Sequence, residues 1–222
     1  MGEACAQVFR DVASAHASDA SAAWLAGKLD ALQTFERMPF FASYAGAGRR
    51  FAGGPPALRE AERNAMQRVG IAVPEAWALA DMARAALLCR AFEAAPPPEH
   101  VAIAREVFLR GDNDERIALL RSLALLPQPA RFADLAIEAC RTHVNDVFAA
   151  IACDNPFPAA HLPEAAFNQL VLKTMFVELP VARILGWRER NNDELRRMVS
   201  DYANERRAAG RSVPEGVAMI GA

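Results

Sequence analysis

Apolar residues recur every three to four positions along most of the chain, which is the spacing that places them on one face of an α-helix. No segment shows the strict alternation of apolar and polar residues that is typical of a half-buried strand. The sequence therefore predicts an all-α protein. The predicted helices cover residues 3–16, 19–32, 33–44, 57–68, 74–94, 99–110, 113–126, 130–153, 163–178 and 193–209.

Proline and glycine separate these helices by short turns, as in the run Ala95-Pro-Pro-Pro98, at Gly111 and at 127–129. Short helices joined in this way favour one compact unit of stacked antiparallel helices. Because no period of about 40 residues repeats, we expect an irregular HEAT-like array rather than a regular solenoid. The expected parts are an N-terminal helical part (1–95), a helical core (96–212) and a loosely ordered tail without periodicity (213–222).

Composition narrows the function classes. The 222 residues carry a formal net charge of −2, which gives no broad electrostatic reason to bind nucleic acid. The N-terminus lacks the pattern of a signal peptide, and no apolar run approaches the roughly 20 residues that cross a bilayer, so we expect no direct membrane insertion. The four cysteines form no CxxC pair, which fits a reduced cytoplasmic location.

No metal or cofactor site can be assembled from these residues. The glycine-rich segment 46–56 is predicted to be a connecting loop, because it lacks the spacing of a phosphate-binding loop. Cys153, Asp154 and His161 have no fourth clustered ligand. His143 falls in the apolar arc of the predicted helix 130–153, where we expect a packed neutral histidine.

Polar residues interrupt the apolar pattern in three places. Asp134, Glu138, Arg141 and Asn145 form a stripe along the predicted helix 130–153, which is either a solvated face or part of a site. The Asn155-Pro step follows that helix and points an amide either into a packed corner or into a cleft.

The other two interruptions lie in the last two long helices. Asn168, Gln169 and Lys173 lie on a nearly all-apolar helix, where a buried amide or amine requires a hydrogen-bond partner. Arg206 lies on the packing face of the last helix, with Asp201 and Glu205 beside it. Each group is either a structural network or the polar part of a ligand pocket.

These residues lie in segments that resemble the EboA family, described as metabolite traffic proteins. The resemblance covers roughly 119–214 and extends more weakly from about Trp77. Its runs are LLRSLALLP, EACRTHVNDVFAAIACDNPFPA, FNQLVLKTMF, LPVARILGWRERNNDEL and DYANERRAAGR. The family pattern matches at Arg141, Asn155, Asn168, Gln169, Lys173, Asp201, Glu205 and Arg206.

The chain departs from that pattern at several positions. His143 stands where the family usually has asparagine, and GWRERNN replaces a more usual GLDERAN. Asn204 and Arg207 stand where the family has histidine and tryptophan, so the resemblance transfers no acid–base role of that histidine to this chain.

The resemblance implies an accessory protein for the trafficking or biosynthesis of a secondary-metabolite precursor. Our first hypothesis is a non-catalytic helical scaffold or carrier, whose partners are other ebo-cluster proteins or a precursor metabolite. Its expected groove is lined by Arg141, Asn145, Asn155, Asn168, Gln169, Lys173, Asp201, Glu205 and Arg206. The alternative is an enzyme that modifies an aromatic or prenylated precursor, with Glu205 or Asp201 as the general base.

Overall fold

The computed structural model describes residues 2–221, and no strand occurs among them, which confirms the predicted all-α class. Two compact units make up the chain, Met1–Leu135 and Ala136–Ala222. This division differs from the three predicted parts, 1–95, 96–212 and 213–222. Those parts stay a prediction, and so does the HEAT-like stacking of the helices. Nowhere in the described chain is a helix both long enough and apolar enough to cross a bilayer.

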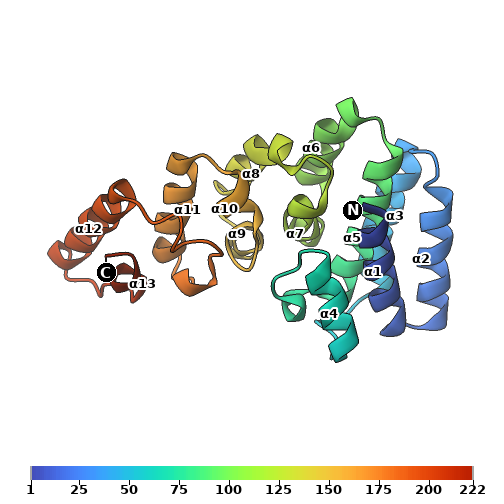
Figure 1. The fold of residues 1–222 in the computed structure, drawn as a ribbon, viewed down its shortest axis with the longest axis horizontal. Coiled ribbons are helices and arrows are strands. Elements are labelled where there is room, and N and C mark those ends of the chain that lie inside the picture. The colour runs from blue at the N-terminus through green and yellow to red at the C-terminus, as the bar shows by residue number, and fades with distance from the viewer. Residues whose placement is uncertain (1, 222) are drawn as a thin grey trace. The chain divides into compact units, whose positions relative to one another are not determined.

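The first unit is built around a buried helix. Its elements are α1 (Gly2–Ala15), α2 (Asp19–Ala31), α3 (Arg37–Arg50), α4 (Glu60–Arg68), η1 (Pro74–Ala76), α5 (Leu79–Ala94), η2 (Pro97–Glu99), α6 (His100–Arg110), α7 (Asn113–Ser122), η3 (Leu123–Leu125) and η4 (Pro129–Phe132). Alanine and leucine on all sides of α5 allow α1, α2, α3 and α7 to pack around it (Figure 1).

The third helix begins and ends later than the sequence pattern predicts. Pro39 lies in the first turn of α3, where its missing N–H leaves no helical hydrogen bond unmade. The helix therefore continues to Arg50, and the first part of the predicted loop 46–56 is helical.

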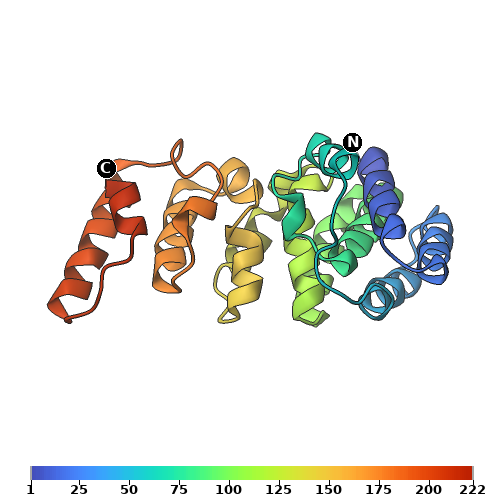
Figure 2. The same ribbon diagram turned by 90° about the horizontal axis from the view of Figure 1, so that it is seen from below.

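The second unit is a short series of helices. Its elements are the end of α8 (Ala133–Ala139, which contains the division between the units), α9 (Asn145–Ala152), α10 (Phe157–His161), α11 (Glu164–Phe176), η5 (Val181–Arg183), α12 (Asp193–Ala208) and α13 (Gly216–Gly221). Figure 2 shows α9, α11 and α12 following one another along this unit. Leu195, Val199 and Ala203 form the buried face of α12.

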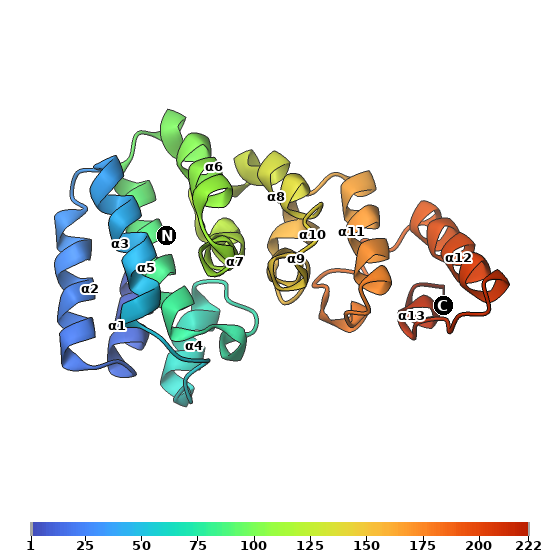
Figure 3. The ribbon, with the colours of Figure 1, turned by 180° about the vertical axis from the view of Figure 1, so that it is seen from behind.

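The prediction of a loosely ordered tail was wrong. Residues Gly216–Gly221 form α13, which packs against α12 (Figure 3). Ile220 is fully buried, and its carbonyl accepts a hydrogen bond of 3.0 Å from the Asn191 side chain. A helix this short shows little periodicity in sequence, and tertiary packing stabilises it.

The predicted continuous helix 130–153 was also wrong. The chain forms η4 and α8, leaves the helix at Cys140 and re-enters it at Asn145. The Thr142 hydroxyl accepts a hydrogen bond of 3.2 Å from the Val144 amide, a local bond that competes with helix formation. His143 lies in this break and is exposed, so it is not the packed histidine that the helical wheel predicted.

A buried ion pair joins α5 to α7 in the first unit. The Nη1 atom of Arg121 lies 2.5 Å from the carboxylate of Asp81 and also donates to the carbonyl of Ala76 at 2.6 Å. The Asp81 side chain is only 7% exposed. Burial raises the pKa of Asp81 above its ordinary value, although the charge of Arg121 opposes that rise.

We predict that Arg121→Met destabilises the first unit by about 3–5 kcal/mol at neutral pH, because it leaves a buried carboxylate without its cation. Without Arg121, the pKa of Asp81 in the folded state lies further above its ordinary value in the unfolded state. The loss should therefore be largest at neutral pH and shrink as the pH falls below the ordinary aspartate pKa, where Asp81 is protonated in both states. Urea unfolding at several pH values measures this dependence.

Arg110→Met is the matched control, since Arg110 pairs with Glu106 at the surface and its side chain is 81% exposed. Its loss should lie within about 1 kcal/mol. Equal losses in the two variants, or a loss in Arg121→Met that grows in acid, would contradict the account of this ion pair.

Candidate functional site

Three of the predicted site residues meet at one pocket of the second unit, which we call the C-terminal pocket. Its volume is about 560 Å³. It is lined by Ile137, Cys140, Arg141, Ala165, Ala166, Gln169, Leu170 and Lys173. Ile137 lies on α8, Cys140 and Arg141 directly follow that helix, and the other five residues follow the helical spacing of α11. The break after α8 therefore forms one wall of the pocket and a single face of α11 forms the other.

Lys173 holds the two walls together. Its Nζ atom donates to the carbonyl of Cys140 at 2.6 Å and to the carbonyl of Thr142 at 2.5 Å, and it lies 4.6 Å from the ring centroid of Phe148. Cys140 and Thr142 both follow α8 without continuing it, so their carbonyls have no partner within a helix. Burial lowers the pKa of Lys173. An ammonium group has three N–H donors, so one remains for a further acceptor.

The C-terminal pocket combines apolar walls with positive charge. Isoleucine, leucine and alanine side chains line it, whereas Arg141 and Lys173 are its two cations. No carboxylate lines it, and among residues 2–221 neither cation forms an ion pair with a carboxylate of its own unit. Such a pocket suits an organic ligand with an apolar body and an anionic group.

The thiol in this pocket is not suited to nucleophilic catalysis. Burial raises the pKa of Cys140 to about 12, although the charge of Lys173 opposes that rise. The thiol is therefore protonated at neutral pH, and the thiolate is the reactive form of cysteine. No group of three or more histidine, cysteine and acidic residues in the described chain is arranged to hold a metal ion.

Asn168 does not line the pocket and forms a reciprocal pair with Asn192. The Asn168 amide donates to Asn192 at 3.2 Å and receives a hydrogen bond of 3.1 Å in return. Asn192 also accepts from the amide of Leu195, which makes it the N-cap of α12. Asn168 is 1% exposed. The pair therefore fastens the start of α12 to α11.

The other two predicted asparagines lie outside the C-terminal pocket. Asn155 is buried, donates to the carbonyl of Ala150 at 2.9 Å and accepts from the amide of Phe157 at 2.9 Å. It therefore joins the end of α9 to the start of α10. Asn145 is the first residue of α9 and is exposed.

The three candidates on α12 are also separate from the C-terminal pocket. Asp201 is exposed and accepts a hydrogen bond of 3.0 Å from Arg197, and Glu205 is exposed. Arg206 donates to the carbonyl of Ser212 at 2.9 Å. It also lines another pocket of about 430 Å³, together with residues of the segments 175–182 and 212–219. Of the nine residues that we expected to line a single groove, only Arg141, Gln169 and Lys173 therefore line the C-terminal pocket.

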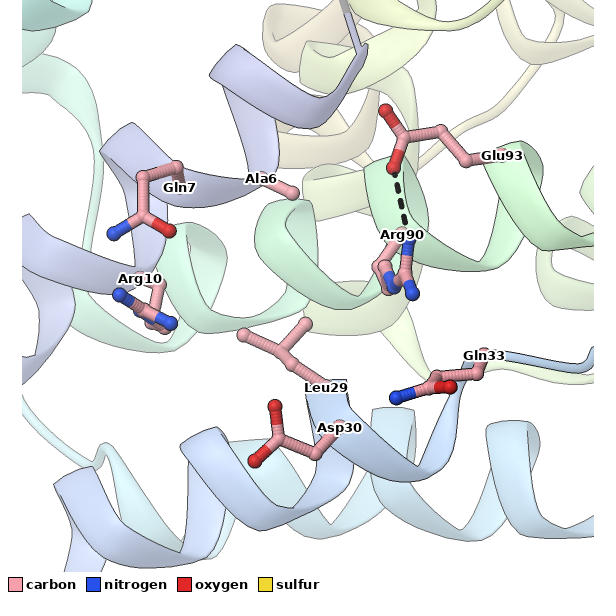
Figure 4. A pocket seen from close by; sticks show the side chains of 8 residues that line it. All are labelled: Ala6, Gln7, Arg10, Leu29, Asp30, Gln33, Arg90 and Glu93. Atoms are coloured by element: carbon pink, nitrogen blue, oxygen red, sulfur yellow. Dashed lines mark ion pairs between the residues drawn. The ribbon is translucent and has the colours of Figure 1, made fainter.

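A third pocket of about 190 Å³ lies among α1, α2 and α5 (Figure 4). Its charges are balanced, because Arg10 and Arg90 line it together with Asp30 and Glu93. Arg90 pairs with Glu93 at 3.5 Å, the dashed line in Figure 4. This small pocket therefore has less uncompensated charge for a ligand than the C-terminal pocket has.

The sequence pattern of the EboA family, described as metabolite traffic proteins, matches residues 5–220. A helical protein with a mainly apolar, cationic pocket is consistent with that description. Because the match spans nearly the whole chain, the protein belongs to the EboA family. No curated protein and no solved structure matches the chain.

We predict that Lys173→Met destabilises the second unit by about 1–3 kcal/mol, because the carbonyls of Cys140 and Thr142 lose their donor. Chemical unfolding measures the loss. Gln169→Met is the control: it lies one turn away on the same pocket face of α11 and is exposed. If both variants unfold at the same denaturant concentration as the original chain, Lys173 does not hold the two walls together.

Proposed function

We propose that the protein is a non-catalytic accessory protein that binds a small metabolite in the C-terminal pocket. The observation that carries this proposal is the set of two cations, Arg141 and Lys173, without a carboxylate in a mainly apolar pocket. The membership of the EboA family supports a metabolite as the ligand. The ligand class is an organic carboxylate or similar monoanion with an apolar body.

The three polar groups have different roles in this proposal. Arg141 is exposed at the mouth of the pocket and pairs with the anionic group of the ligand. Lys173 provides its remaining N–H donor and its charge from the partly buried side. The amide of Gln169 accepts or donates one hydrogen bond at the rim, while Ile137 and Leu170 contact the apolar body.

The pocket chemistry favours binding over catalysis. Catalysis of an acid–base reaction requires a group that gives or takes a proton within hydrogen-bond reach of the substrate. Asp201 and Glu205, the general bases of the alternative hypothesis, are exposed on α12 and do not line the C-terminal pocket. Its thiol is protonated and its amine already donates two hydrogen bonds. We therefore propose release of an unchanged ligand to a partner of the same metabolic system.

We predict that the full chain binds 2-naphthoate, an apolar ring with one carboxylate, and that Arg141→Ala weakens this binding about tenfold. The loss follows from removing a charge-assisted hydrogen bond at an exposed position, so the fold should not change. Isothermal titration calorimetry at low and high salt measures it, and higher salt should weaken binding to the original chain.

Arg211→Ala is the matched control, since Arg211 is an exposed arginine of the same unit that lies outside the pocket. Its affinity should equal that of the original chain. The absence of saturable binding, or an equal loss in the two variants, would contradict the proposed pocket.

A further inference from the structure

A second cationic cavity lies in the first unit, between α2 and α3, and we call it the basic groove. Its volume is about 400 Å³. It is lined by Trp24, Lys28, Ala42, Ser43, Gly46, Arg49 and Arg50. Trp24 and Lys28 are one turn apart on α2, and the other residues follow the helical spacing of α3. Two facing stripes of side chains therefore build this groove.

Three positive charges converge on the basic groove without a compensating acid. Lys28, Arg49 and Arg50 line it, whereas no aspartate or glutamate does. None of the three cations forms an ion pair with a carboxylate among residues 2–221. By contrast, Arg10, Arg37, Arg59 and Arg63 of the same unit all have carboxylate partners.

An indole forms the apolar part of the groove wall. The guanidinium of Arg50 lies 5.2 Å from the ring centroid of Trp24, in a cation–π contact. A Cβ atom at Gly46 would lie 3.4 Å from the Trp24 ring, so the glycine lets the indole approach α3 closely. The Ser21 hydroxyl donates to the carbonyl of Arg50 at 2.9 Å and ties the end of α3 to α2. The wall that carries the cations is therefore fixed in place.

The helix dipole explains why each of the three cations is favourable at its own position, but it does not explain why all three line the same cavity. Lys28, Arg49 and Arg50 all lie in the last turn of a helix, where positive charge interacts favourably with the helix dipole. Arg68 in the last turn of α4 has the same advantage and lines neither this groove nor the C-terminal pocket. The three cations differ from Arg68 because they line one cavity together, beside the indole of Trp24.

We propose that the basic groove binds the phosphate monoester group of a small molecule that also has an apolar or aromatic part. Such a group carries nearly two negative charges at neutral pH and three acceptor oxygens, which match several cationic donors. Trp24 contacts the apolar part, and Arg49 and Lys28 approach the phosphate from the two helices. This site is distinct from the C-terminal pocket, which has two cations and suits a monoanion.

The test is a calorimetric titration of the full chain with 1-naphthyl phosphate, carried out in the Arg141→Ala variant so that the C-terminal pocket contributes little. We expect saturable binding that Arg49→Ala and Lys28→Ala each weaken about fivefold or more. Arg68→Ala is the matched control and should leave the affinity unchanged. 1-Naphthalenesulfonate has the same ring and one charge, and it should bind more weakly than the phosphate ester.

Arg49 and Arg68 are both exposed, so we expect neither substitution to destabilise the fold. Saturable binding that falls in Arg49→Ala and persists in Arg68→Ala supports the groove. An equal loss in both variants would mean diffuse attraction to positive surface and would overturn the proposal, as would the absence of saturable binding. Because Arg141 is already replaced, these outcomes do not depend on the function proposed for the C-terminal pocket.

Discussion

The ammonium group of Lys173 is the interaction on which the C-terminal pocket depends. It satisfies the carbonyls of Cys140 and Thr142, two residues that follow α8 without continuing its helix. Without a donor at this position, the chain would leave the helix with unpaired carbonyls in a partly buried environment. The same contact fixes Arg141 beside α11, and it therefore links the fold of this segment to the shape of the pocket.

The structural role of Lys173 also limits the chemistry of the pocket. Two of its N–H donors are already committed to backbone carbonyls, and the neighbouring thiol is protonated because burial raises its pKa. The groups that remain for a ligand are the ammonium of Lys173, with its charge and one free N–H donor, and the exposed guanidinium of Arg141. These groups can attract and orient an anion, which is the basis for proposing binding rather than catalysis.

Sequence reasoning identified the helices and several of the important polar residues, but not their arrangement. The apolar spacing located α11 and α12 to within two residues at each end, because long amphipathic or buried helices have strong periodicity. It also predicted that Asn168 requires a partner, which proves to be Asn192. Of the eight positions at which the family pattern matches, the structure places Arg141, Gln169 and Lys173 in one pocket and the other five outside it.

The break in the predicted helix 130–153 could not be read from periodicity, because its apolar residues stay in phase across Cys140 to Val144. Its causes are a local threonine hydrogen bond and a lysine 31 residues further along the chain. The break also exposes His143. Neither the apolar pocket walls at Ile137 and Leu170 nor the basic groove was predicted, since both depend on which helix faces pack together.

The proposed metabolite pocket can be tested most directly by mapping amide chemical shifts in the full chain during titration with 2-naphthoate. We expect the largest shifts to cluster at Arg141, Gln169 and Lys173 and at the apolar residues beside them. The exposed face of α12, with Asp201 and Glu205, should stay unaffected. Shifts confined to other parts of the chain, or no shift at saturating ligand, would show that the C-terminal pocket does not bind the ligand.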